Sequence, residues 1–379
     1  MATYDSDDAV PTASHGPDAA PAAPLEPDSN IDTGSDFDDG DSAIESLASS
    51  TASIRDELIK EVKEHGRSYS GYMEASKPLL PYKPTGHVYS NFISANHYNL
   101  FNIPADPGPP EYVLPMDEEE RERLDFQHHI VWLSLNQKLY LAPIKHVHRA
   151  LDAGCGTGIW AIDFADAHPE TEVLGVDLAP VQPHNVPPNL NFEIDDLEQE
   201  WTFSRKFNFI HSQMMIGAFQ NWPRYISQCF NFLERDGYLE IQDIDFVIKC
   251  DDGSLPTNSA LVRWHNYMHD GAFKAGFPLD AISHVPEMMR KAGFVDIVAT
   301  PVKWPINTWP KDKRYKELGK WVSENFNWGA ESMCLALFTR ALGWSIQEVQ
   351  VFSAAMRADL RNRKFHAYWN FWIIHGRKP

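Results

Sequence analysis

Cysteine is scarce in this sequence, because its 379 residues include only four. The four lie far apart, and none forms a CxxC pair or joins a histidine cluster with the spacing of a zinc site. This spacing argues against a disulfide scaffold and a structural zinc, so no metal is expected, and the thiols should be reduced and mostly buried. They are Cys155, Cys229, Cys250 and Cys334.

Long uncharged hydrophobic runs are also missing. No stretch approaches the roughly 18 apolar residues that a membrane-spanning helix needs. The N-terminus is polar and acidic, and it lacks the basic start and apolar core of a signal peptide. These absences predict a protein without membrane contact that resides in the cytoplasm, with the nucleus as the alternative.

Positive charge is the third shortage, with 33 Lys and Arg against 53 Asp and Glu and a net charge of −20. Residues 1–50 hold twelve of the acidic side chains and no Lys or Arg, so the rest of the chain carries only about −8. No basic stripe is present of the kind that neutralises phosphates, which argues against nucleic-acid binding.

The acidic start belongs to residues 1–53, which are rich in Asp, Ser, Ala, Pro and Gly and poor in large apolar side chains. Such a stretch cannot bury enough surface to offset its chain entropy, so we predict a disordered acidic tail. The tail either docks a protein partner or only keeps the protein solvated, and its composition favours the second alternative.

Residues 54–148 are predicted to form an N-terminal arm, partly helical and partly extended, that covers the ligand site of the main domain. A first helix is expected over 53–62, where apolar residues recur on one face. The stretch 75–115 is too rich in proline for a long helix. A second helix is expected over 117–140, with acidic residues in its first turn, where the helix dipole favours them.

Residues 149–379 alternate strands with helices, which implies right-handed βαβ units and a mostly parallel sheet. We predict an α/β, Rossmann-like domain of seven strands with helices on both faces and a helical lid inserted over about 311–363. The charged residues 376–379 should lie just outside the sheet. Aromatic side chains around the insertion, such as Trp304 and Phe326, either line a pocket or pack a core. The expected strands are 149–153, 172–177, 190–194, 207–211, 238–244, 295–303 and 367–374, and the expected helices are 159–167, 225–233, 262–275 and 286–292.

A glycine-rich turn between the first strand and the first helix of this domain carries the chemistry. Glycine permits a tight strand-to-helix turn and lets a ligand approach the main chain, next to the free N–H groups of the helix N-terminus. The turn has the spacing D-x-G-x-G-x-G, with Asp152 followed by Gly154, Gly156 and Gly158. These four residues are candidate ligand contacts.

The spacing of the turn distinguishes between nucleoside ligands. A dinucleotide-binding turn would have its third glycine at position 159, which is Ile. Asp152 would repel a pyrophosphate, whereas it would attract the ammonium group of an amino acid. The turn therefore argues against a nicotinamide-dependent oxidoreductase and favours a cationic ligand without phosphates.

Acidic residues also follow the next two strands. Asp177 ends the second strand, where a carboxylate can accept the hydroxyl groups of a ribose. Asp195 and Asp196 follow the third strand, where a carboxylate can accept from the amino group of an adenine. Each could instead be only a helix cap or a turn residue. Together with the glycine turn, they fit a ligand that combines ribose, adenine and an ammonium group, as S-adenosylmethionine does.

At these positions the chain resembles class I methyltransferases and, more narrowly, the fungal LaeA-like (velvet-complex type) methyltransferases. The resemblance covers roughly residues 55–379 apart from the proline-rich stretch. It implies that S-adenosylmethionine is the methyl donor and that the segment around Tyr69 closes over it. The matching pieces are residues 66–69, 114–119, 123–129, 151–161, 175–183 and 192–198.

Methyl transfer from a sulfonium depends mainly on positioning and desolvation. A general base helps when the acceptor is a hydroxyl or an ammonium group. His211 and His265 come first among candidates for that base, ahead of Asp243, Asp245 and His269. Any of these histidines could instead be structural.

The resembled family contains both regulators of secondary metabolism and tailoring enzymes of biosynthetic pathways. Residues 208–213 read Asn-Phe-Ile-His-Ser-Gln, where the family often has Asp-Phe-Ile-His-x-Arg, and residues 75–111 look like an insertion. These departures favour an enzyme that methylates a small-molecule intermediate of a fungal secondary-metabolite pathway. The alternative is a LaeA-like regulator that acts in a nuclear protein complex.

Overall fold

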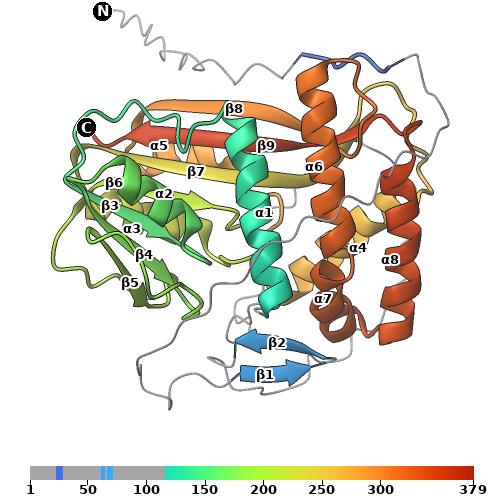
Figure 1. Cartoon of the computed structure of the whole chain (residues 1–379), viewed down its shortest axis with the longest axis horizontal. Helices are drawn as coiled ribbons and strands as arrows, with labels where there is room; N and C mark the ends of the chain where they lie inside the picture. The colour runs from blue at the N-terminus through green and yellow to red at the C-terminus, as the bar shows by residue number, and fades with distance from the viewer. Residues whose placement is uncertain (1–22, 29–60, 65, 71–114, 116) are drawn as a thin grey trace, which may run out of the picture.

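A seven-stranded mixed sheet forms the centre of the molecule (Figure 1). The structure is a computed structural model that describes residues 23–28, 61–64, 66–70, 115 and 117–379. The strand order is β5-β4-β3-β6-β7-β9-β8, in which the neighbours from β5 to β7 are parallel and β9 runs antiparallel to β7 and β8. The strands are β3 (Arg149–Ala153), β4 (Glu172–Asp177), β5 (Leu190–Ile194), β6 (Phe207–Gln213), β7 (Leu233–Cys250), β8 (Val295–Pro305) and β9 (Ala367–Arg377).

The order of strands reverses at β3, because the chain first adds β4 and β5 on one side and then β6 and β7 on the other. In an open α/β sheet, ligands bind outside the carboxyl ends of the strands at such a reversal. The register places Ala153, the last residue of β3, opposite Val176 of β4. The glycine turn after β3 and the end of β4 therefore lie side by side.

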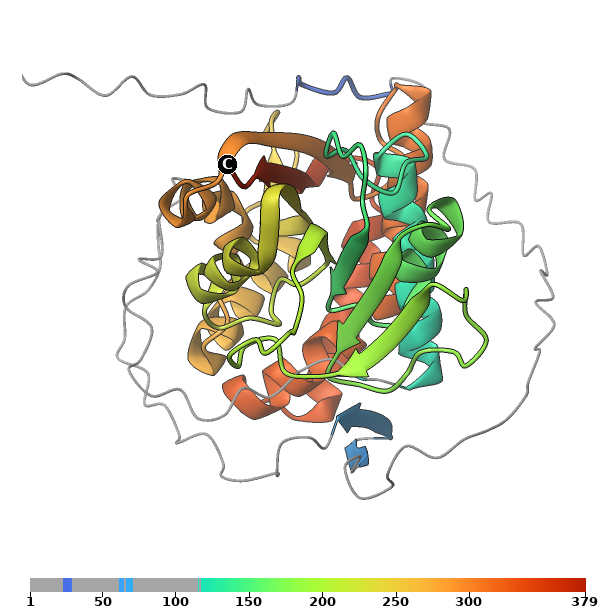
Figure 2. The ribbon, with the colours of Figure 1, turned by 90° about the vertical axis from the view of Figure 1, so that its left-hand side faces the viewer.

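Helices cover both faces of the sheet, as Figure 2 shows. Successive strand residues point to opposite faces, so Ala150 and Phe209 pack in the cluster with α2, whereas Leu151 and Ile210 belong to the larger core on the other face. The helices are α1 (Glu118–Ser134), α2 (Ile159–Ala167), α3 (Trp222–Phe232), α4 (Ala260–Ala275), α5 (Val285–Ala292), α6 (Lys313–Gly329), α7 (Ser332–Leu342) and α8 (Ile346–Arg361), with a short 3-10 helix η1 (Ala281–His284).

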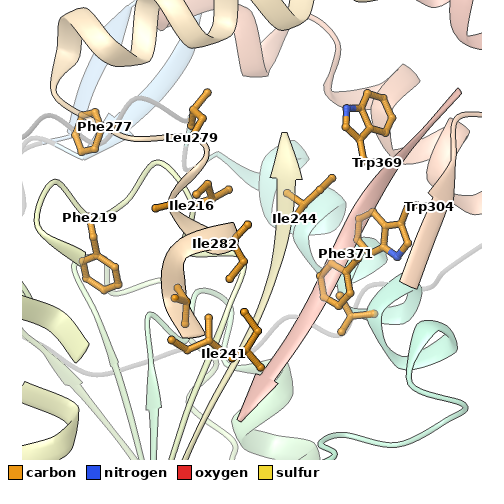
Figure 3. Packing of buried hydrophobic residues seen from close by; sticks show 14 of the residues in the cluster. Ile216, Phe219, Ile241, Ile244, Phe277, Leu279, Ile282, Trp304, Trp369 and Phe371 are labelled. Atoms are coloured by element: carbon orange, nitrogen blue, oxygen red, sulfur yellow. The ribbon is translucent and has the colours of Figure 1, made fainter. Parts of the chain in front are cut away.

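Aromatic side chains fill the part of the larger core where the insertion meets the sheet. Trp304 stacks on Phe371 with their ring centroids 4.5 Å apart, and Phe326 stacks on Trp369 at 4.1 Å. Trp304, Trp369 and Phe371 are completely buried and can be followed in Figure 3. Of the two alternatives for the aromatics around the insertion, core packing is correct for Trp304 and Phe326.

Much of the main domain has the bounds expected from the sequence. The predictions for β3, β4, β5 and α2 are confirmed to the residue, and α4 and α5 begin within two residues of the expected positions. The expected helical insertion over about 311–363 is present as α6, α7 and α8. These elements have strong local signals, namely a short apolar run or an amphipathic repeat bounded by glycine or a capping residue.

The N-terminal arm differs from the expectation. The helix predicted over 53–62 is wrong at its end, because Glu61–Glu64 is a strand, β1, that pairs with β2 (Arg67–Ser70) as an antiparallel hairpin. The beginning of that helix and the proline-rich stretch up to residue 114 lie outside the described residues.

Helix α1 begins where expected, since the side chain of Asp117 accepts a hydrogen bond from the N–H of Glu120 at 3.1 Å. It ends at Ser134 rather than at residue 140. Asn136 and Gln137 adopt left-handed φ values of 55° and 63°, which a continuing helix cannot contain.

The C-terminal residues also differ from the expectation. Residues 376–379 were expected outside the sheet, but β9 continues to Arg377, which lies opposite Tyr238 of β7. Lys378 extends the pairing, because its N–H donates to the carbonyl of Gly237 at 2.9 Å. The prediction is wrong because Tyr238 and Gly237 of β7 offer backbone partners to Arg377 and Lys378, a pairing between distant residues that the charged ending does not reveal.

Residues 23–28 of the expected tail are also described, and they lie against the insertion near the start of α6 (Figure 1). They depart from the prediction of a disordered tail over 1–53, and the rest of that stretch lies outside the described residues. Within the described part of the chain, no helix has the length and hydrophobicity of a membrane span. The same residues contain no group of three or more His, Cys, Asp or Glu side chains placed to hold a metal ion.

Candidate functional site

A cavity of about 230 Å³ lies at the carboxyl ends of the parallel strands, between them and helices α1, α4 and α7. One half is polar and is formed by the glycine turn and acidic side chains, and the other half is mostly apolar. The polar half includes Asp152, Gly154, Gly156, Asp177, Asp195, Asp196 and Glu198. The apolar half includes Met214, Met215, Phe246, Met268, Phe277, Leu279, Met333 and Leu337.

The three glycines of the turn have left-handed φ values, which are 74° at Gly154, 54° at Gly156 and 82° at Gly158. Two of them also lack space for a side chain. A Cβ on Gly154 would lie 2.1 Å from the sulfur of Met215, and a Cβ on Gly158 would lie 2.4 Å from the ring of Phe192. Both the backbone conformation and the packing therefore require glycine at these two positions.

Asp177 shapes the turn from the end of β4. Its Oδ2 accepts a hydrogen bond from the N–H of Gly156 at 2.8 Å, and its Oδ1 accepts from the N–H of Ala179 at 3.1 Å. Burial raises the pKa of Asp177, although these hydrogen bonds oppose the shift. The sequence predicted a ligand contact here, and the structure adds a second role in holding the loop.

Asp152 is almost completely buried, and it pairs with the ring of His211 on β6, with Oδ1 and Nδ1 2.8 Å apart. Its second oxygen, Oδ2, is buried and has no hydrogen-bond partner within the described residues. Because Asp152 also lines the cavity, Oδ2 is an acceptor that a bound cation or N–H group could satisfy.

Asp195 and Asp196 both line the cavity at the end of β5. Oδ1 of Asp195 accepts from the N–H of Asp196 at 2.9 Å, and Oδ1 of Asp196 accepts from the N–H of Glu198 at 2.9 Å. Asp195 and Asp196 therefore stabilise the turn that follows β5 and also line the cavity. Glu198, which the sequence did not single out, accepts from the N–H groups of Gln220 and Asn221 and joins this wall to the start of α3.

Besides Gly158 of the turn, three residues predicted to act at the site are not part of the cavity wall that the described residues form. His211 is fully buried and stacks on Trp160, with ring centroids 3.6 Å apart. The Nδ1 atom of His265 lies 3.1 Å from the carbonyl oxygen of Phe246, behind the wall. A role as general base for either histidine stays a prediction that this geometry does not support.

Tyr69, predicted to contact the cofactor, is the third of these residues. It is 2% exposed in β2, and the guanidinium of Arg340 on α7 lies 5.1 Å from the centre of its ring. Burial raises the pKa of its hydroxyl to about 12. The hairpin that carries Tyr69 also contacts α1, where Arg67 pairs with Asp117. Tyr69 thus helps to fix the hairpin between α7 and α1.

Helix α1 contributes polar wall residues that the sequence did not identify. Arg123 donates to both carboxylate oxygens of Glu120, at 2.6 and 3.0 Å, and also to Gln127 at 2.9 Å and Asn325 at 2.9 Å. Glu120 and Arg123 are each 2% exposed. This buried network connects α1 with α6, two helices that are far apart in the sequence. Its signal in the sequence was the Glu-x-x-Arg spacing in a predicted helix, which is equally common on solvated faces.

Asp243, a weaker candidate base, is fully buried in β7 behind the cavity. Its Oδ2 accepts from the N–H of Ile216 at 2.8 Å, so it holds the loop after β6 that carries Met215 and Ile216 into the wall. Burial raises its pKa from 3.8 to about 7, although its hydrogen bonds oppose the shift.

This raised pKa predicts a pH-dependent stability. Between pH 4 and 7 Asp243 binds a proton in the folded chain but not in the unfolded chain, so its contribution to stability is complete at low pH and is lost as the pH rises to about 7. We expect the free energy of unfolding of wild type, relative to Asp243→Asn, to fall by up to about 1.4 kcal/mol per pH unit over this range. Urea unfolding of both proteins at pH 5, 6 and 7 measures this difference, and a constant difference contradicts the prediction.

Comparisons of the sequence with known proteins identify the family to which the chain belongs. Residues 126–298 match the model of a methyltransferase domain. The chain is 38% identical over 270 residues to Methyltransferase pytC of Aspergillus terreus, a match that covers 71% of this chain and 83% of pytC. It is 36% identical over 276 residues to Secondary metabolism regulator LAE1 of Cochliobolus heterostrophus, covering 71% and 90% of the two chains.

Among solved structures, the chain is similar to phosphoethanolamine N-methyltransferase 2 of Haemonchus contortus in complex with S-adenosyl-L-methionine. The identity is 17%, the TM-score is 0.39, and the match covers 68% of this chain and 52% of that chain. The matches to the two fungal proteins extend over most of their length. The chain therefore belongs to the LaeA-like family of S-adenosylmethionine-dependent methyltransferases.

Proposed function

We propose that the protein transfers a methyl group from S-adenosylmethionine to an uncharged, largely apolar small molecule of a fungal secondary-metabolite pathway. One observation carries this proposal. A single cavity joins the acidic glycine turn to a wall of Met, Phe and Leu side chains. A donor and an apolar acceptor could thus meet in a site from which water is excluded.

The polar half fits S-adenosylmethionine. The unpartnered Oδ2 of Asp152 offers an acceptor for the ammonium group. The Asp177 carboxylate lines the cavity at the end of β4, where it would also accept from the ribose hydroxyls. Asp195 and Asp196 would contact the adenine, and the left-handed glycines leave the main chain of the turn open to the ligand. When bound, S-adenosylmethionine supplies an electrophilic methyl group on a sulfonium.

The chain's own contribution to the reaction is positioning and the exclusion of water. Among the described residues that line the cavity, His128 of α1 is the only histidine. Its Nε2 lies 3.2 Å from Oδ2 of Asp163 on α2, and its buried Nδ1 has no partner within the described residues. If the acceptor is a hydroxyl, we propose Nδ1 of His128 as the group that would take its proton.

The apolar half of the cavity is expected to select the acceptor. We expect Met268→Glu to lower turnover at least about a hundredfold, because a carboxylate there would be desolvated against Met and Phe side chains or would draw in water. The dissociation constant of S-adenosylmethionine should change less than about twofold, because Met268 lies on α4, away from the glycine turn. Turnover and calorimetric binding, measured on the same preparations, separate the two effects.

Met268→Leu is the matched control for that variant. It keeps the volume and the apolar character of the side chain, so turnover should stay within about threefold of wild type. If Met268→Glu kept wild-type turnover, the apolar half of the cavity would not be part of the acceptor site.

Labelling with methyl-labelled S-adenosylmethionine tests the proposed acceptor class. The purified protein is incubated with a small-molecule filtrate of the source organism and, separately, with its protein fraction. Label in an apolar small molecule, absent with Met268→Glu, is the expected result. Label confined to the protein fraction contradicts the proposal.

The second candidate function is regulation of secondary metabolism through protein contacts, in the cytoplasm or the nucleus. Similarity to a protein named as a secondary metabolism regulator favours it. The acidic residues of 1–50 offer a charged segment for a partner. Methyl label confined to the protein fraction would support this function.

A further inference from the structure

Six residues of the acidic N-terminal stretch form an extended segment against the insertion. The N–H of Asp28 donates to the carbonyl of Trp309 at 2.9 Å, and the N–H of Lys311 donates to the carbonyl of Glu26 at 2.8 Å. Between these two bonds, Pro27 pairs with Pro310 as an antiparallel bridge. Figures 1 and 2 both show the segment beside the start of α6, far in the sequence from its partner.

The two prolines suit this bridge. In an antiparallel pair flanked by hydrogen bonds in this way, the central residues face each other without exchanging bonds, so neither needs an N–H group. Proline therefore costs no hydrogen bond at either position. It also fixes φ in both segments, which lowers the entropy lost when they dock.

The side chains of the segment alternate in chemistry. Leu25 packs against the hydrophobic core. Glu26 and Asp28, two residues apart and so on the same side of an extended segment, pair with Lys311 and Lys316. The docking surface, residues 309–316, therefore recognises a short extended peptide by its backbone, by one apolar side chain and by two carboxylates.

We propose that the docking surface 309–316 is a peptide-binding site for an extended segment with the pattern apolar-acidic-Pro-acidic. Residues 25–28 of the same chain are the ligand of this site, and they bind to it and leave it reversibly. Docking is reversible because it rests on two backbone hydrogen bonds and two ion pairs near solvent, each worth about 1 kcal/mol or less. Because the segment belongs to the same chain, its effective concentration at the surface is roughly millimolar, which favours the docked state.

The two ion pairs differ in their exposure to solvent, and this difference predicts which pair contributes more to docking. The side chains of Lys316 and Asp28 are 35% and 19% exposed, whereas those of Lys311 and Glu26 are 67% and 81% exposed. Water screens the second pair more strongly. The pair Asp28–Lys316 is therefore the specific anchor, and Lys316 should matter more than Lys311.

Amide hydrogen exchange in the full chain tests the docking. We expect Lys316→Glu to speed exchange at the amides of Asp28 and Lys311 about fivefold to tenfold, and Lys311→Glu to speed exchange at the Asp28 amide less. Lys313→Glu, at an exposed lysine of the same stretch, is the matched control and should leave both amides unchanged. Adding Asp28→Lys to Lys316→Glu reverses both charges and should restore slow exchange. Wild-type exchange in Lys316→Glu would overturn the proposal.

A synthetic peptide tests whether the surface recognises this pattern when the segment is supplied as a separate molecule. A fluorescent peptide of residues 22–29 is titrated into the full chain carrying Leu25→Ala, Glu26→Lys and Asp28→Lys, which vacates the surface. We expect this chain to bind the peptide about tenfold more tightly than wild type, whose own segment competes. Adding Lys316→Glu should abolish the gain, and a peptide of the same composition in scrambled order should not bind. Equal binding by the vacated and wild-type chains, or no binding by either, contradicts the proposal.

Discussion

Gly154→Ala is expected to weaken the binding of S-adenosylmethionine by roughly a hundredfold. Alanine in a left-handed conformation costs about 1–2 kcal/mol. The added Cβ would also lie 2.1 Å from the sulfur of Met215, so that side chain must move, and Met215 is part of the cavity wall. The strain and the displaced wall side chain together correspond to this loss of affinity. Isothermal titration calorimetry on the purified variant measures it directly.

Gly343→Ala is the matched control for this variant. Gly343 has a φ of 73°, almost the same as the 74° of Gly154, but a Cβ there would have open space around it. It caps the end of α7, away from the glycine turn. The control should therefore lose about 1 kcal/mol of stability and bind S-adenosylmethionine like wild type. Equal affinities for the two variants would mean that Gly154 is needed only for its backbone conformation.

Arg123→Met should lower the free energy of unfolding by about 3–5 kcal/mol. The substitution leaves the carboxylate of Glu120 buried without the guanidinium that now donates to both of its oxygens, and removing one partner of a buried pair has costs of this size. Gln127 and Asn325 also lose a donor. Urea unfolding at neutral pH measures the change.

Arg121→Met provides the comparison, because Arg121 pairs with Glu118 at the same i, i+3 spacing on the same helix but at the surface. Its loss should cost less than about 1 kcal/mol. Combining Arg123→Met with Glu120→Gln should recover part of the lost stability, since the amide can be buried at a lower cost than a carboxylate. Similar losses for Arg121→Met and Arg123→Met would show that the buried network does not stabilise the fold.

The polar half of the site could be predicted from the sequence because its signals are local. The turn from Asp152 to Gly158 joins a strand to a helix, and each glycine position follows from backbone geometry. Asp177 and the pair Asp195 and Asp196 follow the next two strands, whose carboxyl ends meet at one edge of a parallel sheet. Sequence order alone therefore placed these carboxylates in one cavity wall.

The rest of the site depends on contacts between residues distant in the sequence. Arg123 donates a hydrogen bond to Asn325, and Asp152 is hydrogen-bonded to His211. No local sequence pattern predicts either contact. The sequence offers His211 as a base because it lies at the end of the fourth expected strand of the domain. The structure instead places its ring beneath Asp152 and against Trp160, where it can orient the carboxylate but does not line the cavity.

Long-range pairing also explains the errors in the fold. The end of the chain reads as a charged, solvated tail, but Arg377 pairs with Tyr238 of β7, which is distant in the sequence. The composition of residues 1–53 predicts disorder, yet the segment 23–28 has a matching surface 309–316 that composition cannot reveal. In both cases a distant partner decides the structure.

Calorimetric titration of the wild-type chain with S-adenosylmethionine and with NAD tests the central claim most directly, namely that the glycine turn and its carboxylates bind a cationic nucleoside without phosphates. S-adenosylmethionine should bind at one site, NAD should show no measurable binding, and Asp152→Asn should weaken the binding of S-adenosylmethionine by about tenfold or more, because it loses a charge-assisted interaction. Binding of NAD as tight as that of S-adenosylmethionine, or an Asp152→Asn protein with wild-type affinity, would contradict the claim.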